Sequence, residues 1–514
     1  MLFNSYIFLL AFLPVTLIGY FFIGKRAQTA KPVLVFLLVM SAIFTAWMNI
    51  WYLVVLAVSM LVNYGFGRML AKEQKRARGC LILGISINIL ALLFFKYTNF
   101  FIGTINSIFK TDQPMMKLLL PLGISFYTFG NIAYLVDIYR NECDGYSLLE
   151  FATYTAYFPK LIQGPITLHD DLLPQLIEKK NWKPNTEHLS KGLYRFALGL
   201  GKKVLLADVL ALIANTGYRN FENLLGFGAI LAVLSYSLQI YFDFSGYTDM
   251  AIGVAMMMNI ELPENFMSPY KSKSISEFWD RWHITLTKFF TKYLYIPLGG
   301  SRVALPRILM NVLIVFLVSG LWHGSNWTFV IWGGIHGLLM IVERLYRTLA
   351  KKHSERQGTE SGNIQAKNTK SSVVVWLLNI VKVLITFAVV TVLWSLFRAD
   401  SLYQFGVLWR KIFAMGIGDF LADIDPDMLT AVSEIVEVQI LGKVVPSGCL
   451  YKFQELAVVG LPTFGLIFCW FTKNSDAKTK DFKPTIKNAL ITVGLVIWCI
   501  LSLSNVTQFI YSNF

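Results

Sequence analysis

The sequence is poor in charged residues and in cysteine. Only 15% of its 514 residues are charged, 55% are hydrophobic, and the mean hydropathy is +0.55. So little charge excludes a soluble enzyme, a secreted module and a disordered regulator, although the length alone would suit about three soluble domains. The five cysteines are too scattered for a disulfide framework, and we interpret them as packing residues: Cys80, Cys143, Cys449, Cys469 and Cys499. The composition therefore predicts an integral membrane protein.

Several motifs of soluble enzymes are also missing. The chain has no P-loop, no GxSxG nucleophile elbow, no HExxH pair and no dinucleotide-binding fingerprint. His283 and His323 are far apart in the sequence and no third ligand stands out, so we expect no bound metal. The 46 Lys and Arg against 31 Asp and Glu give a net charge of +15, but no basic stripe with interleaved aromatics accompanies it. We therefore expect no nucleic-acid partner, because such an excess is typical of cytoplasmic loops in membrane proteins.

Apolar runs fill most of the chain. At about 20 residues a crossing they allow roughly ten to fourteen helices, so we predict an all-α, polytopic fold that includes re-entrant segments. The first run, 1–23, lacks the basic start and the cleavage site of a signal peptide and should remain as the first span. The other runs lie near 33–66, which should form two helices, and near 80–109, 117–136, 194–214, 226–259, 307–345, 373–396, 455–472 and 488–511.

The distribution of charge between the apolar runs indicates the orientation. Lys and Arg follow the first and third spans, which places these loops in the cytoplasm and the N-terminus outside. The polar stretch 347–372 is predicted to be a cytoplasmic linker between a membrane core, 1–346, and C-terminal transmembrane helices, 373–514. Between 417 and 455 Lys and Arg are scarce, which predicts an extracytoplasmic excursion.

Ionisable residues are costly in an apolar chain unless they are paired or face a cavity, and here they cluster in the central third. His323 follows a nearly unbroken apolar run from Ile308 to Leu321, and Gly320 and Gly324 beside it leave room for a substrate or another backbone. A neutral imidazole can take a proton from a hydroxyl and return it later, so His323 is a candidate general base. The alternative is a histidine that only forms hydrogen bonds between helices.

Two further histidines have functional and structural interpretations. Trp279, Trp282 and His283 fall at helical spacings and can share one face, either beside a substrate or as an anchor at the membrane interface. His336 is flanked by glycines, and we interpret it as part of tightly packed helices.

The acidic residues before this region lie in a Gly- and Ser-containing stretch that we interpret as a break between half-helices. Asp243 and Asp249 there either cap the half-helices or take part in catalysis. The candidates for lining a substrate site or tunnel are Asp243, Tyr247, Asp249, Trp279, Asp280, Arg281, Trp322 and Ser325.

Five stretches of the sequence resemble a known family. SEFWDRWHITLTKFFTKYLYIPLGGSR at 276–302 and LVSGLWHGSNWTFVIWGGIHG at 317–337 closely resemble the membrane-bound O-acyltransferase family, in particular its bacterial alginate O-acetylation branch. Three further stretches also resemble that branch: PLGISFYTFGNIAYLVDIYR at 121–140, YFPKLIQGPI at 157–166 and YFDFSGYTDMAIG at 241–253. Departures from the family pattern, at Ser301, Gly130 and Asn131, do not remove a proposed catalytic group.

The resemblance implies a multi-helix membrane core around a central tunnel, with His323 as the catalytic histidine and His283 at a second polar position. The family transfers an acyl group from a thioester donor to a hydroxyl. In this branch, acetyl-CoA or an acyl-carrier thioester gives up its acetyl group in the cytoplasm, and the group crosses the bacterial cell membrane. A separate extracytoplasmic acetyltransferase of the SGNH type then modifies a cell-surface polysaccharide such as alginate. The donor is a substrate, and no bound cofactor is implied.

In the expected mechanism, the donor enters near the basic, aromatic segment 271–302 and His283 helps to orient the reactants. His323 then deprotonates the acceptor hydroxyl, or carries the acetyl group itself. Within the family, the alternative is transfer of D-alanyl or another acyl group to teichoic acid or peptidoglycan. Outside it, a transporter or flippase and a purely structural scaffold are the alternatives.

Overall fold

The protein is built from helices, as its composition predicts. The computed structural model describes residues 1–72, 77–356, 372–416, 418, 424–436 and 447–503, and within them every regular element is helical. Eight helices in these ranges are long and apolar enough to cross a membrane, and two further apolar helices are shorter. The expected all-α, polytopic fold is therefore confirmed for the described residues.

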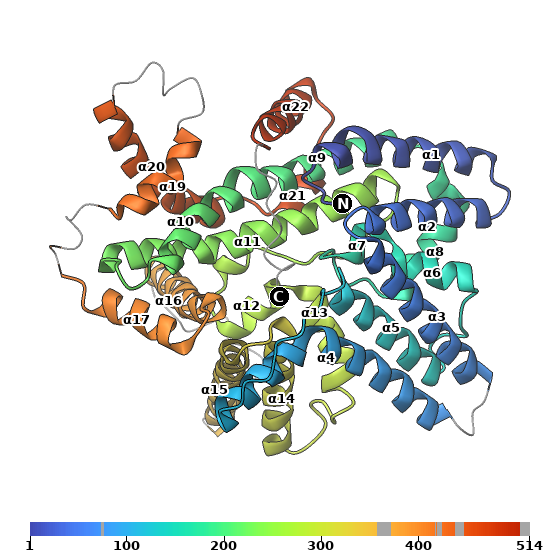
Figure 1. Cartoon of the computed structure of the whole chain (residues 1–514), viewed down its shortest axis with the longest axis horizontal. Helices are drawn as coiled ribbons and strands as arrows, with labels where there is room; N and C mark the ends of the chain where they lie inside the picture. Colours follow the sequence, from blue (N-terminus) through green and yellow to red (C-terminus); the bar gives the residue numbers. More distant parts are fainter. Residues whose placement is uncertain (73–76, 357–371, 417, 419–423, 437–446, 504–514) are drawn as a thin grey trace. The chain divides into compact units, whose positions relative to one another are not determined.

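The chain divides into two compact units, which we describe separately. The first comprises residues 1–208, 240–265 and the part from 475 onward. Its helices pack in succession, since α2 contacts both α1 and α3, and α5 contacts both α3 and α4 (Figure 1). They are α1 (Leu13–Arg26), α2 (Lys31–Ala46), α3 (Ile50–Lys72), α4 (Ala77–Phe109), α5 (Ile124–Tyr139), α6 (Leu148–Ala156), α7 (Phe158–Leu161), α8 (His169–Ile177), α9 (Thr186–Gly201), α21 (Ser475–Lys480) and α22 (Ile486–Leu501).

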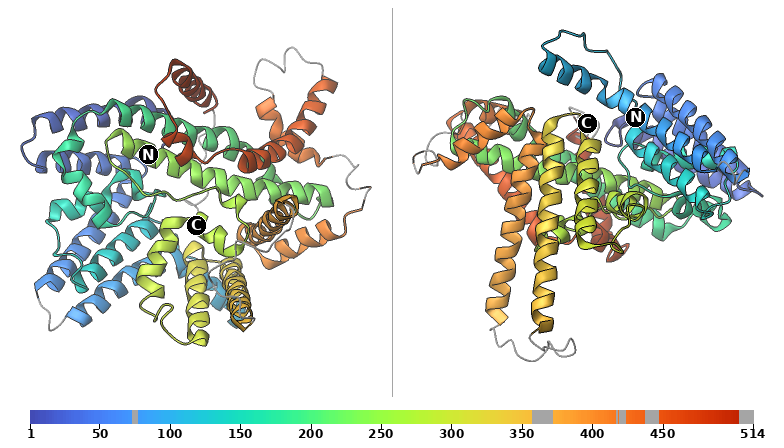
Figure 2. Two further views of the ribbon diagram at one scale, coloured as in Figure 1. Left: turned by 180° about the vertical axis from the view of Figure 1, so that it is seen from behind. Right: turned by 90° about the horizontal axis from the view of Figure 1, so that it is seen from below.

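The second unit comprises residues 209–239 and 266–474. In it α14 packs against α15, and α15 lies beside α16, as the right-hand view of Figure 2 shows. Its helices are α10 (Asp208–Arg219), α12 (Ile275–Arg281), α13 (Ile284–Phe290), α14 (Leu305–His323), α15 (Trp327–Arg356), α16 (Ser372–Arg398), α17 (Leu402–Phe413), α19 (Pro426–Val436) and α20 (Ser447–Phe471).

One long helix, α11 (Gly226–Met257), contributes residues to both units. Its most apolar window is 83% buried, whereas that of α4 is only 11% buried. Protein therefore encloses α11, while α4 presents its apolar side chains outward, as a helix in contact with lipid must.

Within the first unit, glycines let α9 approach α11 closely. A Cβ on Gly199 would lie 2.5 Å from the carbonyl oxygen of Gly246, and a Cβ on Gly192 would lie 2.7 Å from that of Gly253. Small residues allow helix backbones to approach in this way, which brings the polar side chains of the two helices within reach of each other.

Several expectations about helix boundaries need correction. α11 is continuous, so the break expected around Asp243 and Asp249 is wrong, because close packing on α9 accommodates its Gly and Ser. The apolar run 117–136 becomes helical only at Ile124, after Pro121 and a left-handed Gly123.

The linker and the excursion are described only in part. α15 continues to Arg356 and α16 begins at Ser372, so both ends of the stretch 347–372 are helical, and residues 357–371 lie outside the described residues. Of the predicted excursion at 417–455, the structure describes α19 and the start of α20, but not 417, 419–423 or 437–446. The position of either segment relative to a membrane stays a prediction.

Candidate functional site

Three histidines of the second unit lie in one buried cluster of aromatic side chains. His283 and His336 are fully buried, and His323 is only 2% exposed. The ring of His323 lies 4.8 Å from Trp322, 5.2 Å from Trp332 and 5.3 Å from Phe397, measured between centroids. We call this group the histidine cluster; its members are His283, His323, His336, Trp279, Trp322, Trp332, Trp394 and Phe397.

The hairpin of α14 and α15 positions His323. His323 is the last residue of α14, and the helix ends there because Gly324 is extended, with φ at −163°. A Cβ on Gly320 would lie 2.4 Å from the carbonyl oxygen of Phe329, and Gly333 faces it across the hairpin. The sequence left open whether Gly320 makes room for a substrate or for another backbone. The structure shows a backbone there, that of α15, which therefore packs against His323.

His283 lies at a sharp turn rather than within a helix. α12 ends at Arg281, Trp282 is extended, and His283 has left-handed dihedrals (φ 46°, ψ 51°) before α13 begins. The expected shared helical face of Trp279, Trp282 and His283 is therefore wrong. A non-glycine residue in this conformation carries strain of order 1–3 kcal/mol, and such residues concentrate at functional sites.

Packing holds this turn in place. Trp282 lies between Phe278 and Trp394, at centroid distances of 5.6 and 4.8 Å, and the backbone N–H of Met267 donates to the Arg281 carbonyl. Burial lowers the pKa of the His283 imidazole to about 3, so the ring is neutral at physiological pH.

Trp322 connects the two predicted catalytic histidines. Its indole lies 4.8 Å from the ring of His323 and 6.1 Å from the ring of His283. The two imidazoles are thus in the same cluster, although 39 residues separate them in the sequence.

The cluster also contains buried N–H groups that lack an acceptor. The indole N–H of Trp332, that of Trp394 and the Nε2 of His336 have no hydrogen-bond partner among the described residues. The Trp279 indole N–H donates to His336 Nδ1 at 3.3 Å, which leaves the proton of a neutral imidazole on Nε2. An unsatisfied buried donor costs about 1–3 kcal/mol, which a bound carbonyl oxygen would recover.

The structure brings together only some of the predicted site residues. Trp279 and Trp322 join the two histidines, whereas Asp280 and Ser325 are exposed at the surface of the second unit. Arg281 forms an ion pair with Glu277, 2.6 Å away on its own helix. The donor path predicted along 271–302 remains a prediction.

The remaining three candidates belong to the first unit. Asp249 accepts from Arg195 and Lys202 at 2.6 and 2.7 Å, and Asp243 accepts from Lys203 at 2.6 Å. Tyr247 stacks on Phe3, with centroids 4.9 Å apart. Because Asp243 and Asp249 are buried in ion pairs, a structural role accounts for their presence on α11.

No metal centre is evident in the described part of the chain, where no three His, Cys, Asp or Glu side chains gather as ligands.

Comparison with known proteins connects this geometry with a reaction. The sequence profile of the membrane-bound O-acyltransferase (MBOAT) family matches residues 42–388, which include His283 and His323. This chain belongs to the membrane-bound O-acyltransferase family. It is thus a multi-pass membrane enzyme that transfers acyl groups to oxygen.

Relatives of this O-acyltransferase act on different polymers, as their names state. The peptidoglycan O-acetyltransferase of Helicobacter pylori is 34% identical, over 100% of this chain and 98% of its own. The probable alginate O-acetylase of Pseudomonas aeruginosa is 37% identical, over 81% of this chain and 75% of its own. The teichoic acid D-alanyltransferase of Bacillus subtilis is 28% identical, over 55% of this chain and 73% of its own.

Part of the histidine cluster of this O-acyltransferase could not be found from the sequence. Trp394 and Phe397 come from α16, more than 60 residues after His323, and nothing in their local sequence marks them. Trp332 carries a weak signal, because it lies in the WGGIHG string of the family motif.

Proposed function

We propose that this O-acyltransferase takes an acetyl group from a cytoplasmic thioester, acetyl-CoA or an acyl carrier, and passes it across the bacterial cell membrane to acetylate a cell-surface glycan. The observation that carries the proposal is the histidine cluster, which combines the buried imidazoles of His283 and His323 with N–H donors that lack acceptors. An acetyl group is favoured because two relatives named for acetylation align with 81% or more of the chain, against 55% for the D-alanyltransferase.

In the proposed reaction His323 is the general base. Its neutral imidazole takes the proton of the acceptor hydroxyl while the hydroxyl oxygen attacks the thioester carbonyl carbon. As the C–S bond breaks, the proton returns to the departing thiolate, so the products are an acetyl ester and a thiol. If His323 carries the acetyl group instead, the same bonds break in two steps.

The remaining members of the cluster stabilise charge and position reactants. The partnerless N–H groups of Trp332, Trp394 and His336 are candidates to bind the carbonyl oxygen as it becomes negative. A donor of this kind gains strength in a site from which apolar rings exclude water. His283 remains neutral and orients one reactant by hydrogen bonding.

The acceptor polymer and the partner extend the proposal further. Peptidoglycan is our first choice of glycan, since the relative named for it aligns over the whole chain, and an alginate-like polysaccharide is the second. We expect a separate extracytoplasmic acetyltransferase of the SGNH type to receive the acetyl group and to place it on the polymer.

Labelled acetyl transfer by purified protein in proteoliposomes tests the proposal. His323→Gln should lower transfer from acetyl-CoA or acetyl carrier protein by about 10²–10⁴-fold. The matched control is His353→Gln, an exposed histidine on α15, which should transfer at the normal rate. Unchanged transfer in His323→Gln would remove this residue from the reaction, and transfer from a D-alanyl donor but not from an acetyl donor would reassign the acyl group.

Analysis of cell-wall glycans from cells with matched membrane levels of each variant then identifies the polymer. Loss of acetyl groups from peptidoglycan in the His323→Gln cells supports our first choice. Loss from an exopolysaccharide alone supports the second.

A further inference from the structure

One stretch of the second unit is strongly basic. From 282 to 342 the sequence contains four Lys or Arg and no Asp or Glu. The four are Lys288, Lys292, Arg302 and Arg307. A local excess of one charge sign attracts ligands of the opposite sign, so this stretch favours an anion.

Arg344 on α15 contacts this stretch through two hydroxyl groups. Its Nη1 donates to the Tyr295 hydroxyl at 3.3 Å, and its Nη2 donates to the Ser301 hydroxyl at 3.4 Å. The two hydroxyl oxygens are 3.0 Å apart. The three polar groups therefore meet at one place, where a single phosphate group can contact all of them.

A tight turn places Ser301 beside Tyr295. Tyr295 is the last residue of the π-helix η6 (Thr291–Tyr295). Gly299 and Gly300 follow with positive φ values of 108° and 55°, which reverse the direction of the chain. The Gly300 N–H donates to the Tyr295 carbonyl at 2.9 Å, so the turn is held by its own backbone and does not need a ligand to form.

Hydrogen-bond donors remain available where the three side chains meet. A guanidinium has only N–H donors, and Arg344 directs one of its terminal nitrogens to each hydroxyl, which leaves other N–H groups for a ligand. Only one of the two hydroxyl protons can serve the contact between Tyr295 and Ser301, so the other hydroxyl proton is available as well.

No carboxylate among the described residues forms an ion pair with Arg344. Its neighbour Glu343 accepts from the Ser276 backbone N–H at 2.9 Å and pairs with Arg347 instead. The charge of the Arg344 guanidinium is thus not compensated by the described protein. Arg344 is half-buried and Ser301 is exposed, so a ligand can reach the guanidinium from solvent.

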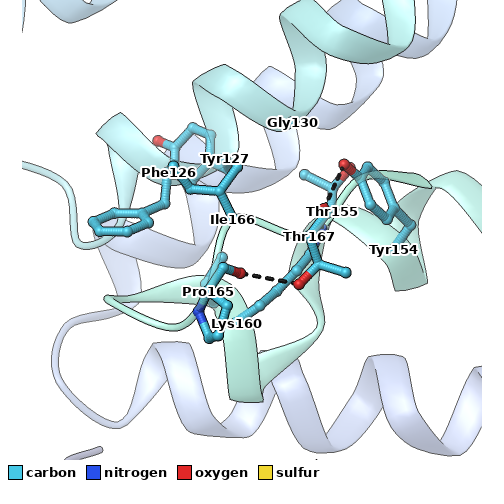
Figure 3. A pocket seen from close by; sticks show the side chains of 10 residues that line it. Phe126, Tyr127, Gly130, Tyr154, Thr155, Lys160, Pro165, Ile166 and Thr167 are labelled. Atoms are coloured by element: carbon cyan, nitrogen blue, oxygen red, sulfur yellow. Dashed lines mark hydrogen bonds between the residues drawn. The ribbon is translucent and has the colours of Figure 1, made fainter. Parts of the chain in front are cut away.

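Lys160 in the first unit is another cation that no carboxylate pairs with among the described residues, but it is enclosed. Its Nζ donates to the Thr167 carbonyl at 3.4 Å, and Figure 3 shows it among the side chains that line a small pocket. That pocket admits a group about as large as a water molecule, so a phosphate does not fit. Of these two cations, Arg344 is the one that a phosphate can reach.

We propose that Arg344, Tyr295 and Ser301 bind a phosphate ester. The planar guanidinium matches two oxygens of a phosphate, and the available hydroxyl proton reaches a further oxygen. The negative charge of the ester compensates Arg344 and suits the basic stretch from 282 to 342.

The phosphate ester can belong to the thioester donor or to a phospholipid. Arg344 lies eight residues beyond His336 of the histidine cluster, which is about 12 Å along α15. In coenzyme A and in acyl carriers a pantetheine arm separates the phosphate from the sulfur, as such a distance requires. Arg344 also lies just before the predicted cytoplasmic linker at 347–372. The donor is therefore the expected occupant, and this assignment rests on the proposed function.

Thermal unfolding of the purified full-length protein in nonionic detergent tests the site without any acyl transfer. Coenzyme A should raise the Tm saturably, because a ligand that binds only the folded state stabilises it, whereas pantetheine, which lacks the phosphates, should not. Arg344→Gln should raise the coenzyme A concentration for half of the Tm rise by about tenfold or more. The matched control is Arg307→Gln, an exposed arginine of the same basic stretch, which should leave that concentration unchanged.

A second variant covers the case in which Arg344→Gln does not fold. Tyr295→Phe removes one hydroxyl and keeps the ring and every charge, so the coenzyme A concentration for half of the Tm rise should increase about tenfold. His323→Gln should bind coenzyme A as the unsubstituted protein does. A failure of coenzyme A binding is thus distinguishable from a failure of the proposed chemistry at His323.

The lipid source is tested with phosphatidylglycerol in mixed micelles, against diacylglycerol, which lacks the phosphate. A Tm rise with phosphatidylglycerol but not with coenzyme A, lost in Arg344→Gln, would support the phosphate site and overturn its assignment to the donor. A Tm that responds to neither phosphate compound would overturn the site. A response that both Arg344→Gln and Tyr295→Phe retain in full would overturn it as well.

Discussion

A methyl group added at Gly320 should separate α14 from α15 and displace His323. In Gly320→Ala the new Cβ would lie 2.4 Å from the Phe329 carbonyl oxygen, whereas ordinary contact begins at 3.4 Å. The backbones must therefore move apart by about 1 Å, the difference between these two distances. His323 lies one helical turn further along α14 and packs on α15 through Trp332, so it moves with the hairpin.

The expected effect on rate is larger than that on stability. A displacement of about 1 Å at a catalytic group costs on the order of 100-fold in rate. Overpacking costs about 1–3 kcal/mol, and the better helix propensity of alanine offsets up to about 1 kcal/mol of that. Gly320→Ala should therefore remain largely folded, with labelled acetyl transfer reduced roughly 100-fold.

Gly334→Ala is the matched control for this measurement. The same methyl group there would lie 3.6 Å from the nearest atom, Leu317 Cδ2, which is an ordinary contact. Acetyl transfer and Tm should both stay near those of the unsubstituted protein. Equal transfer rates in Gly320→Ala and Gly334→Ala would refute the inference that the close packing of this hairpin positions His323.

Three other substitutions separate structural from chemical roles. Lys203→Met removes the ammonium that pairs with buried Asp243 and with Asp208, and it should cost about 3–5 kcal/mol of unfolding free energy. The double replacement with Asp243→Leu should recover the part of the loss in Tm that the unpaired Asp243 causes. The pKa of His283 is about 3 in the folded protein and 6.5 in the unfolded chain. Between these two pH values only the unfolded chain binds the proton, so the free energy of unfolding should decline as the pH falls, by up to about 1.4 kcal/mol per pH unit. His283→Asn should flatten that decline in Tm, and an unchanged slope would contradict the burial of a neutral ring. Trp332→Phe keeps an aromatic ring but removes its N–H, so acetyl transfer should fall about tenfold or more with an unchanged Tm, and an unchanged rate would exclude this donor.

The local sequence determined the class of the protein and the two histidines of interest. Hydrophobic content and the length of apolar runs predict membrane helices because each helix satisfies its own backbone hydrogen bonds, whatever its neighbours are. His283 and His323 were predictable because each lies in a recognisable string of the O-acyltransferase family. Their catalytic roles remain predictions that the substitutions above test.

Tertiary structure decided which side chains meet. The continuity of α11 and the ion pairs of Asp243 and Asp249 depend on the glycine contacts that bring α9 close, and a break was the natural interpretation without them. The turn at His283 depends on packing around Trp282, which overrides the helical spacing of its neighbours.

The same limit applies to the histidine cluster. Trp394 enters it from α16, far along the chain from His283 and His323. Apolar periodicity specifies how each helix forms, because that depends on neighbours within a few residues. Which helices become neighbours depends on side-chain packing between distant segments, and only the folded chain contains that information.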